Sequence, residues 1–148
     1  MMIRDHIDEE ISAYQQDPFQ DLTYQDALTI IAIYAAQIDP EDCQQDIRRA
    51  AKIILKHPEF EGCEEGISNR FNMYVNSMQA VTPQHALDLA ADVLKNLEAK
   101  RSAFELAVEV AMTGKVLAEE KRAVLETIAD RLHINQDVMH RTIDKAAG

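Results

Sequence analysis

The apolar residues of this chain recur at intervals of three or four in nearly every segment, which is the period of an amphipathic helix. The stripe of the first segment, residues 3–14, consists of Ile3, Ile7, Ile11 and Tyr14. Residues 27–36 are apolar except for Thr29, as expected of a buried central helix. Strict alternation of Val, Ile and Thr, which marks a strand, is absent from the sequence. The pattern predicts an all-α, compact bundle of seven to eight helices.

Helix breakers and caps place the ends of the expected helices. Pro40 and Pro83 are expected to begin helices, His57-Pro58 to end one and Gly114 to end another. Asn135 is expected to cap the last helix, with Ile134 and Met139 as a hydrophobic staple. The helix that begins at Pro83 is expected to reach Leu97 and to turn that residue inward. The other expected helices cover residues 3–14, 22–37, 64–78, 102–112 and 118–132.

Two stretches of the chain resemble each other. ALTIIAIYAA at 27–36 corresponds to AFELAVEVAM at 103–112, and each is followed by a loop and an acidic helix start. Two such helical hairpins would pack face to face as a pseudo-two-fold internal repeat. We expect a single domain, 1–148, made of four parts: an extra N-terminal helix at 1–20, a first repeat at 22–60, connecting helices at 63–99 and a second repeat at 102–147.

Charge and composition narrow the class of function. The chain of 148 residues has 26 acidic and 15 basic residues and a net charge of −11, so a nucleic acid or an anionic membrane would repel it. The sequence contains no apolar run long enough to span a bilayer, and the charged N-terminal stretch leads us to expect no signal peptide. Its two cysteines, Cys43 and Cys63, form no CxxC pair and are typical of reduced thiols. We expect a soluble cytoplasmic protein whose partners are other proteins.

Carboxylates gather at one expected helix start: Asp39, Glu41, Asp42 and Asp46. A hard divalent cation needs several such oxygens around one point. Capping and complementation of the helix dipole explain the same residues without a metal, and we favour that interpretation.

Two further acidic pairs have the acid-x-x-His spacing of di-iron bundles: Asp130 with His133, and Asp137 with His140. A di-iron site also needs a carboxylate from each of two more helices, so we interpret these pairs as ordinary polar residues on the surface. No phosphate loop, nucleophile elbow or HExxH motif is present in the sequence. We expect no enzyme and no resident cofactor.

The segment AVEVAMTGKVLAEEKRAVLETIADRLHI, residues 107–134, resembles the C-terminal half of the tellurite-resistance TerB-like family. That family has an apolar helix, a Ser-Asp-Gly type loop, an acidic helix start and a helix ending in Leu-Gly or Leu-His. The matching residues are Gly114, Val116, Glu119, Glu120 and Lys121. Residues 27–60 resemble the family's N-terminal copy more loosely, and the similarity extends over about 22–147.

The resemblance implies a helical bundle with a role in the bacterial response to tellurite or other stress, with the proteins of a stress-resistance complex as partners. It implies no known reaction. Family members with intact acidic loops are expected to bind divalent metal. Here Thr113 is followed directly by Gly114, without the family Asp, and the first loop reads Gln37-Ile38-Asp39-Pro40. We therefore expect no cation at the Thr113-Gly114 loop, and the Asp39 loop is the better site if either loop binds one.

A comparison of the two copies predicts a contact surface. Aligning Ala27 with Ala103 places Thr29 at the position of Glu105 and Ile33 at that of Glu109. The first copy thus lacks both charges on this helix face, and an apolar face needs a cover. We expect residues 3–14 to cover Thr29 and Ile33, in cis or exchanged between subunits. The alternative is the same face of a second copy in a two-fold homodimer.

These observations favour a non-enzymatic, stress-associated binding or scaffold protein. The alternative is a small divalent-metal-binding protein that uses the cluster at Asp39–Asp46. Only the alternative predicts that a metal ion changes the stability of the fold.

Overall fold

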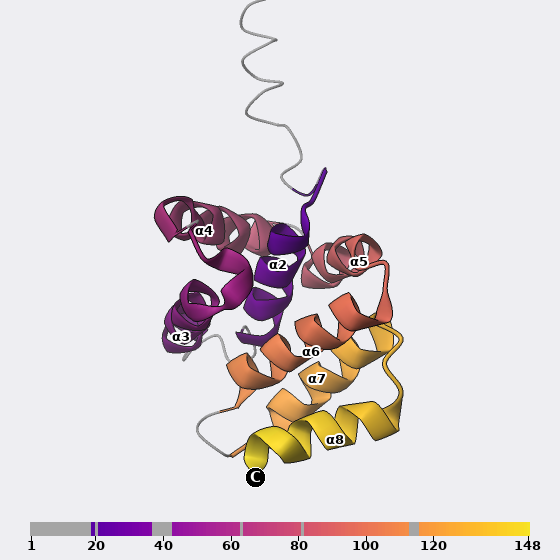
Figure 1. Cartoon of the computed structure of the whole chain (residues 1–148). Coiled ribbons are helices and arrows are strands. Elements are labelled where there is room, and N and C mark those ends of the chain that lie inside the picture. The colour runs from indigo at the N-terminus through magenta and orange to yellow at the C-terminus, as the bar shows by residue number, and fades with distance from the viewer. Residues whose placement is uncertain (1–18, 20, 37–42, 63, 81, 113–115) are drawn as a thin grey trace, which may run out of the picture.

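The computed structural model describes residues 19, 21–36, 43–62, 64–80, 82–112 and 116–148. Within them every regular element is helical, which confirms the predicted all-α bundle (Figure 1). The elements are α2 (Tyr24–Ala36), α3 (Cys43–Lys56), the short 3-10 helix η1 (Pro58–Phe60), α4 (Glu64–Ala80), α5 (Pro83–Val93), α6 (Leu97–Ala111), α7 (Glu119–Arg131) and α8 (Gln136–Ala147). Among these described helices, none has the length and apolar character needed to cross a membrane.

Helix α2 lies at the centre of the bundle and contacts α3, α4, α5, α6 and α7. Because neighbours surround it, a helix that is apolar on nearly every face is stable there, and all residues from Asp26 to Ile33 are buried. Each fully buried Leu or Ile contributes roughly 1.5–3 kcal/mol relative to an exposed position. The sequence-based prediction of a buried central helix is therefore confirmed.

Side chains cap three of the helix starts. At α2, Thr23 Oγ1 accepts from the Asp26 backbone N–H at 3.1 Å, and Asp26 Oδ2 accepts from the Thr23 N–H at 3.1 Å. This reciprocal pair is a capping box. Asn135 Oδ1 accepts from the Val138 N–H at 2.9 Å, as predicted for the last helix. Asn96 Oδ1 accepts from the Ala99 N–H at 2.8 Å and starts α6.

The cap at Asn96 corrects one predicted boundary. The expected helix from Pro83 to Leu97 is wrong, because α5 ends at Val93 and α6 begins at Leu97. Asn is neutral to unfavourable inside a helix but satisfies a first-turn N–H when it precedes one, so the break falls here. Leu97 consequently faces solvent with 55% of its surface exposed, instead of facing the core.

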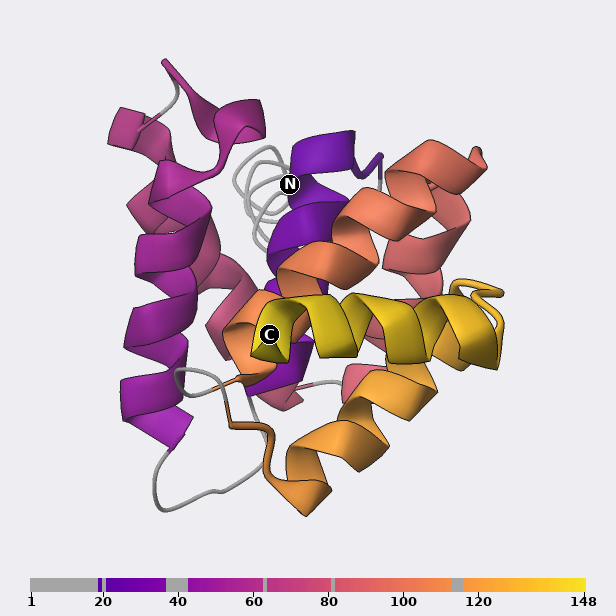
Figure 2. The same ribbon diagram turned by 60° about the horizontal axis from the view of Figure 1, so that its bottom comes forward.

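The two halves of the chain make corresponding contacts. Helices α2 and α3 pack as one hairpin, α6 and α7 pack as another, and α2 packs against α6. Helix α4 then contacts α2 and α3, as α8 contacts α6 and α7 (Figure 2). Each half therefore has three helices in the same contact order, and α5 joins them while packing on α2, α4 and α7.

Each hairpin also holds the end of a helix in the other hairpin. Arg49 of α3 donates from Nη2 to the Val110 carbonyl oxygen near the end of α6. Lys121 of α7 donates to the Ala35 and Ala36 carbonyl oxygens at the end of α2, at 3.5 and 3.3 Å. The last carbonyls of a helix lack intrahelical donors and carry its negative dipole end, so a cation there is favourable. These two contacts join the halves of the bundle.

Candidate binding groove

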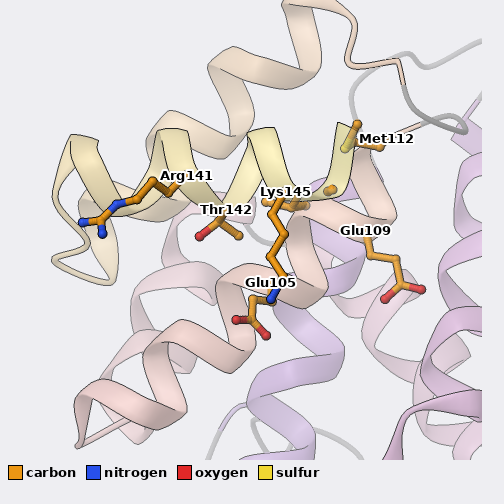
Figure 3. A pocket seen from close by; sticks show the side chains of 8 residues that line it. Glu105, Glu109, Met112, Arg141, Thr142 and Lys145 are labelled. Atoms are coloured by element: carbon orange, nitrogen blue, oxygen red, sulfur yellow. The ribbon is translucent and has the colours of Figure 1, made fainter. Parts of the chain in front are cut away.

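A hollow of the described surface lies between α6 and α8 and has a volume of about 530 Å³. The two helices run in the same direction along it (Figure 1). Its lining comes from these two helices and from Met112, the residue that follows α6 (Figure 3): Glu105, Val108 and Glu109 of α6, and Arg141, Thr142, Lys145 and Ala146 of α8. A smaller hollow of about 180 Å³ continues it toward the starts of both helices, past Arg101 and Val138. The groove therefore follows the lengths of both helices.

The spacing of residues on each helix explains the chemistry of the groove. Val108 and Met112 of α6 are 1% and 4% exposed and supply an apolar floor. Glu105 and Glu109 lie one turn apart on the same helix and are exposed. On α8, buried Met139 and Ile143 face the core, which leaves the opposite side of the helix to polar residues. The floor is thus apolar and one wall is acidic.

The second wall of the groove is basic. Arg141 and Lys145 lie one turn apart on α8 and are both exposed. Arg141 Nε donates to the Asp137 backbone oxygen of its own helix at 3.3 Å. In the described part of the chain no ion pair joins either base to Glu105 or Glu109. The groove therefore presents opposite charges on its two walls to whatever lies between them.

A hollow of the first half lies between α2 and α4 and has a volume of about 160 Å³. Its lining is near the start of α2, so its counterpart in the second half is the hollow of about 180 Å³ near the starts of α6 and α8. Phe60 of η1 lines it and is 2% exposed. Gln25 Nε2 donates to the Glu59 carbonyl oxygen at 2.6 Å and holds η1 against α2. Thr29, which also lines it, is buried, whereas the aligned Glu105 of α6 is exposed.

A buried carboxylate also lies in this first groove. Asp26 is 4% exposed, and its Oδ1 lies 2.9 Å from Arg70 Nη2. Burial and the adjacent Asp26 carboxylate raise the pKa of Tyr74 to about 12, since both disfavour a second negative charge. The Asp26 charge is satisfied by Arg70 and by the Thr23 N–H, so this cluster stabilises the fold.

The structure tests few of the site residues predicted from sequence. Outside the described residues lie Ile3, Ile7, Ile11 and Tyr14 of the first stripe and Asp39, Glu41 and Asp42 of the acidic cluster, together with the Thr113-Gly114 loop. Asp46 belongs to α3, but its side chain is not among those described. The metal and N-terminal contact hypotheses therefore stay predictions.

The two residues expected beneath a cover, Thr29 and Ile33, are both buried. Thr29 Oγ1 donates to the Gln25 carbonyl oxygen at 2.8 Å. Phe60 and residues of α4 share the small groove with Thr29, so helix α4 and η1 form at least part of the cover that the sequence analysis assigned to residues 3–14.

The residues of both acid-x-x-His pairs are exposed. Asp130 and His133 line an open hollow of about 380 Å³ together with Asp88 and Asp92 of α5. Arg131 Nη1 lies 2.6 Å from Asp88 Oδ1 at its edge. Within the described ranges, no group of three or more His, Cys, Asp or Glu could hold a metal ion.

Comparison with protein-family models, with curated proteins and with solved structures finds no match to this chain. The resemblance of residues 107–134 to the TerB-like family therefore depends on the sequence motifs alone.

Only the acidic wall of this groove could be predicted from the sequence. The spacing of Glu105 and Glu109 places both on one helix face, but it does not show that Arg141 and Lys145 lie opposite them. The signal was present, because these two bases are four residues apart on a helix whose other face is apolar. What the sequence does not show is that α8 lies beside α6.

Proposed function

We propose that this chain is a non-enzymatic, stress-associated binding or scaffold protein that docks a partner protein in the α6–α8 groove. The observation that carries the proposal is the groove itself, with an apolar floor of Val108 and Met112 between charged walls. A mostly apolar surface with a few placed charges and an opening to solvent is the usual form of a protein docking site.

The chemistry of the lining favours binding over catalysis. A nucleophile is activated by a base within hydrogen-bond reach. Thr142 is the hydroxyl-bearing residue among those that line the groove, and its Oγ1 donates to the Val138 carbonyl oxygen of its own helix at 2.8 Å. The carboxylates of Glu105 and Glu109 stand on the other helix, and no lining histidine is present.

The association with stress depends on the resemblance of residues 107–134 to the TerB-like family. That resemblance also supports a bacterial protein that acts in a complex with other proteins. Two cysteines outside any CxxC pair support a cytoplasmic location. The cluster at Asp39–Asp46 supports the alternative of a divalent-metal-binding protein, and this alternative depends on the sequence alone.

Two adjacent alanines near the end of α8 allow a matched test. Ala146 and Ala147 are both exposed, and only Ala146 lines the groove. Ala146→Arg places a long side chain in the groove, whereas Ala147→Arg adds the same side chain outside it. The tagged wild type and both variants are purified from cells grown with and without tellurite, and the bound proteins are quantified by mass spectrometry.

We expect the Ala146→Arg variant to lose partners that both the wild type and the Ala147→Arg variant retain. The wild type and Ala147→Arg should bring down more of these partners from cells grown with tellurite than from cells grown without it. If all three proteins bring down the same partners in the same amounts, docking in the α6–α8 groove is wrong. If the partners are lost but stress does not change them, the binding function stands and the stress association does not.

A further inference from the structure

We propose that the occupant of the α6–α8 groove is an amphipathic helix of a partner protein with a basic flank beside α6 and an acidic flank beside α8. This inference rests on the proposed function, since it names the kind of partner for the same groove. It follows from the shape of the groove, from the burial of the corresponding helix face in the first half of the chain, and from the opposite charges of the two walls.

The shape of the groove suits a third helix. Helices α6 and α8 run side by side, and the hollow follows both of them from Arg101 and Val138 to Met112 and Ala146. The twelve residues of α8 correspond to about 18 Å of helix, or roughly three turns. A partner helix of that length presents apolar residues at i, i+3, i+4 and i+7 along one side, and these anchors fit the floor of Val108 and Met112.

The first half of the chain covers the corresponding face of its first helix. Thr29 and Ile33 of α2, which align with the two glutamates of the acidic wall, are buried. Phe60 of η1, in the connection between α3 and α4, lines the same hollow as Thr29 and is buried. The connection between α7 and α8 spans only 132–135, and its apolar residues Leu132 and Ile134 belong to the core. The corresponding face of α6 is exposed and available to another molecule.

The charges of the walls select the flanks and the direction of this helix. Glu105 and Glu109 attract basic residues, and Arg141 and Lys145 attract acidic ones. Turning a helix end to end exchanges its two flanks, so a helix with segregated charges fits in one direction only. Charge patterns of this kind contribute more to specificity and orientation than to raw affinity.

Two other occupants fit less well. A second copy placed groove to groove sets helix against helix at the rims and leaves the hollow between them empty, contrary to the close packing of stable interfaces. The chain's own residues 3–14 contain one basic residue, Arg4, against four acidic ones, Asp5, Asp8, Glu9 and Glu10. That segment lacks a basic flank for the α6 wall.

The probe is a designed helical peptide with a Leu and Phe stripe, Lys on one flank and Glu on the other. Its control has the same composition, stripe and net charge, with Lys and Glu mixed on both flanks. Each peptide is titrated by fluorescence anisotropy against the wild type, Ala146→Arg and Ala147→Arg. We expect the segregated peptide to bind the wild type at least about tenfold more tightly than the mixed one, a preference that salt reduces. Ala147→Arg should bind like the wild type, and Ala146→Arg should bind neither peptide.

A variant in which the charges of the two walls are exchanged tests the direction of the bound helix. Glu105→Lys, Glu109→Lys, Arg141→Glu and Lys145→Glu together leave the net charge unchanged, and all four positions are exposed. A spin label at the peptide N-terminus should broaden the amide signals at one end of α6 in the wild type and at the other end in this variant. Circular dichroism confirms that the variant is folded.

The outcomes separate this inference from the proposed function. If both peptides bind equally while Ala146→Arg abolishes binding, the groove is a docking site and the inference about charge is wrong. If neither peptide binds the wild type, the inference is wrong, and the co-purification experiment decides the function independently. A dimer in sedimentation that Ala146→Arg dissociates, or a peptide of residues 1–18 that binds as tightly as the segregated one, would identify a different occupant and overturn the proposal.

Discussion

The α2–α4 groove and the α6–α8 groove lie at corresponding places in the two halves of the chain, yet the aligned residues of the first helix are buried in one half and exposed in the other. Thr29 and Ile33 of α2 are buried, and Phe60 lines the same hollow as Thr29, whereas the aligned Glu105 and Glu109 of α6 are exposed. The acid in the first, Asp26, is 4% exposed and paired with Arg70, whereas the acids in the second are exposed. One half thus satisfies its own groove, and the other half leaves it available to a partner.

The comparison indicates that the connection after the second helix of each half determines whether the groove of that half is covered. Residues 57–63 are long enough to include η1 and to bury Phe60, and residues 132–135 are not. If this interpretation is right, changes in the first groove should affect stability and changes in the second should affect binding.

Removal of the Phe60 ring should have the largest effect on stability. Phe60→Ala takes a residue that is 2% exposed out of the core, and such truncations cost about 3–5 kcal/mol through lost burial and the remaining cavity. Urea unfolding measures the change. Leu97→Ala, at a site that is 55% exposed, is the control and should cost less than about 1 kcal/mol. Equal losses of stability at the two sites would show that the Phe60 ring does not stabilise the packing beside the first groove.

High pH should destabilise the fold through Tyr74. Its pKa is about 12 in the folded protein against 10.0 in the unfolded chain. Below pH 10 both states keep the proton and Tyr74 adds no pH dependence. Between 10 and 12 only the unfolded state releases it, so the free energy of unfolding falls, by up to roughly 3 kcal/mol at the upper end.

Urea unfolding at several alkaline pH values checks the Tyr74 prediction, and Tyr74→Phe is the control because it removes this contribution. Burial also raises the pKa values of Tyr24 and Tyr34, so the difference between wild type and variant is the informative quantity. The same alkaline slope in both proteins would contradict the assignment.

Neutralising the buried Asp26 should lower the free energy of unfolding more than neutralising an exposed Asp does. Asp26→Asn removes the charge that pairs with Arg70 and weakens a hydrogen bond at the start of α2, and we expect a loss of about 1–3 kcal/mol. Asp88→Asn breaks the 2.6 Å ion pair with Arg131. The side chains of Asp88 and Arg131 are 46% and 39% exposed, so the free energy of unfolding should fall by less than about 1 kcal/mol. Thermal unfolding at neutral pH compares them, and a larger loss for Asp88→Asn would reverse the order proposed here.

Charges on the open groove should hardly affect stability. Glu105 and Glu109 are exposed and unpaired with Arg141 or Lys145, so Glu105→Gln with Glu109→Gln should change the free energy of unfolding by less than about 0.5 kcal/mol. Urea unfolding measures this. A loss above 1 kcal/mol would mean that the acidic wall belongs to the fold, as the first groove does.

Divalent metal should leave the melting temperature unchanged if the chain is a binding protein without a metal site. Melting in EDTA and then in excess Ca²⁺ or Mg²⁺ tests the acidic cluster at Asp39–Asp46, because an ion that binds only the folded state raises its stability. Asp39→Asn with Asp42→Asn is the matching variant. A metal-dependent rise that this variant abolishes would favour the alternative function.

The sequence by itself was sufficient for most of the helices, because their signals are local. The apolar run at 27–36, the break at His57-Pro58 and the cap at Asn135 each act within a few residues, and the structure confirms all three. The same local chemistry explains the two helix ends that were wrong, because α5 ends at Val93 and α6 begins at Leu97 instead of at 102. Asn96 was a cap signal of the same kind as Asn135, but the apolar residues on both sides of it suggested a continuous helix.

The placement of whole helices, by contrast, determines which of the two aligned helix faces is covered and which is exposed. Phe60 reaches its place because η1 lies against α2, Asp26 meets Arg70 across 44 positions of the sequence, and Lys121 reaches the end of α2 from α7. These contacts depend on how whole helices are placed relative to one another, and a helical period does not encode that placement. The basic wall of the α6–α8 groove became visible for the same reason, since it faces the acidic wall only after α8 has packed beside α6.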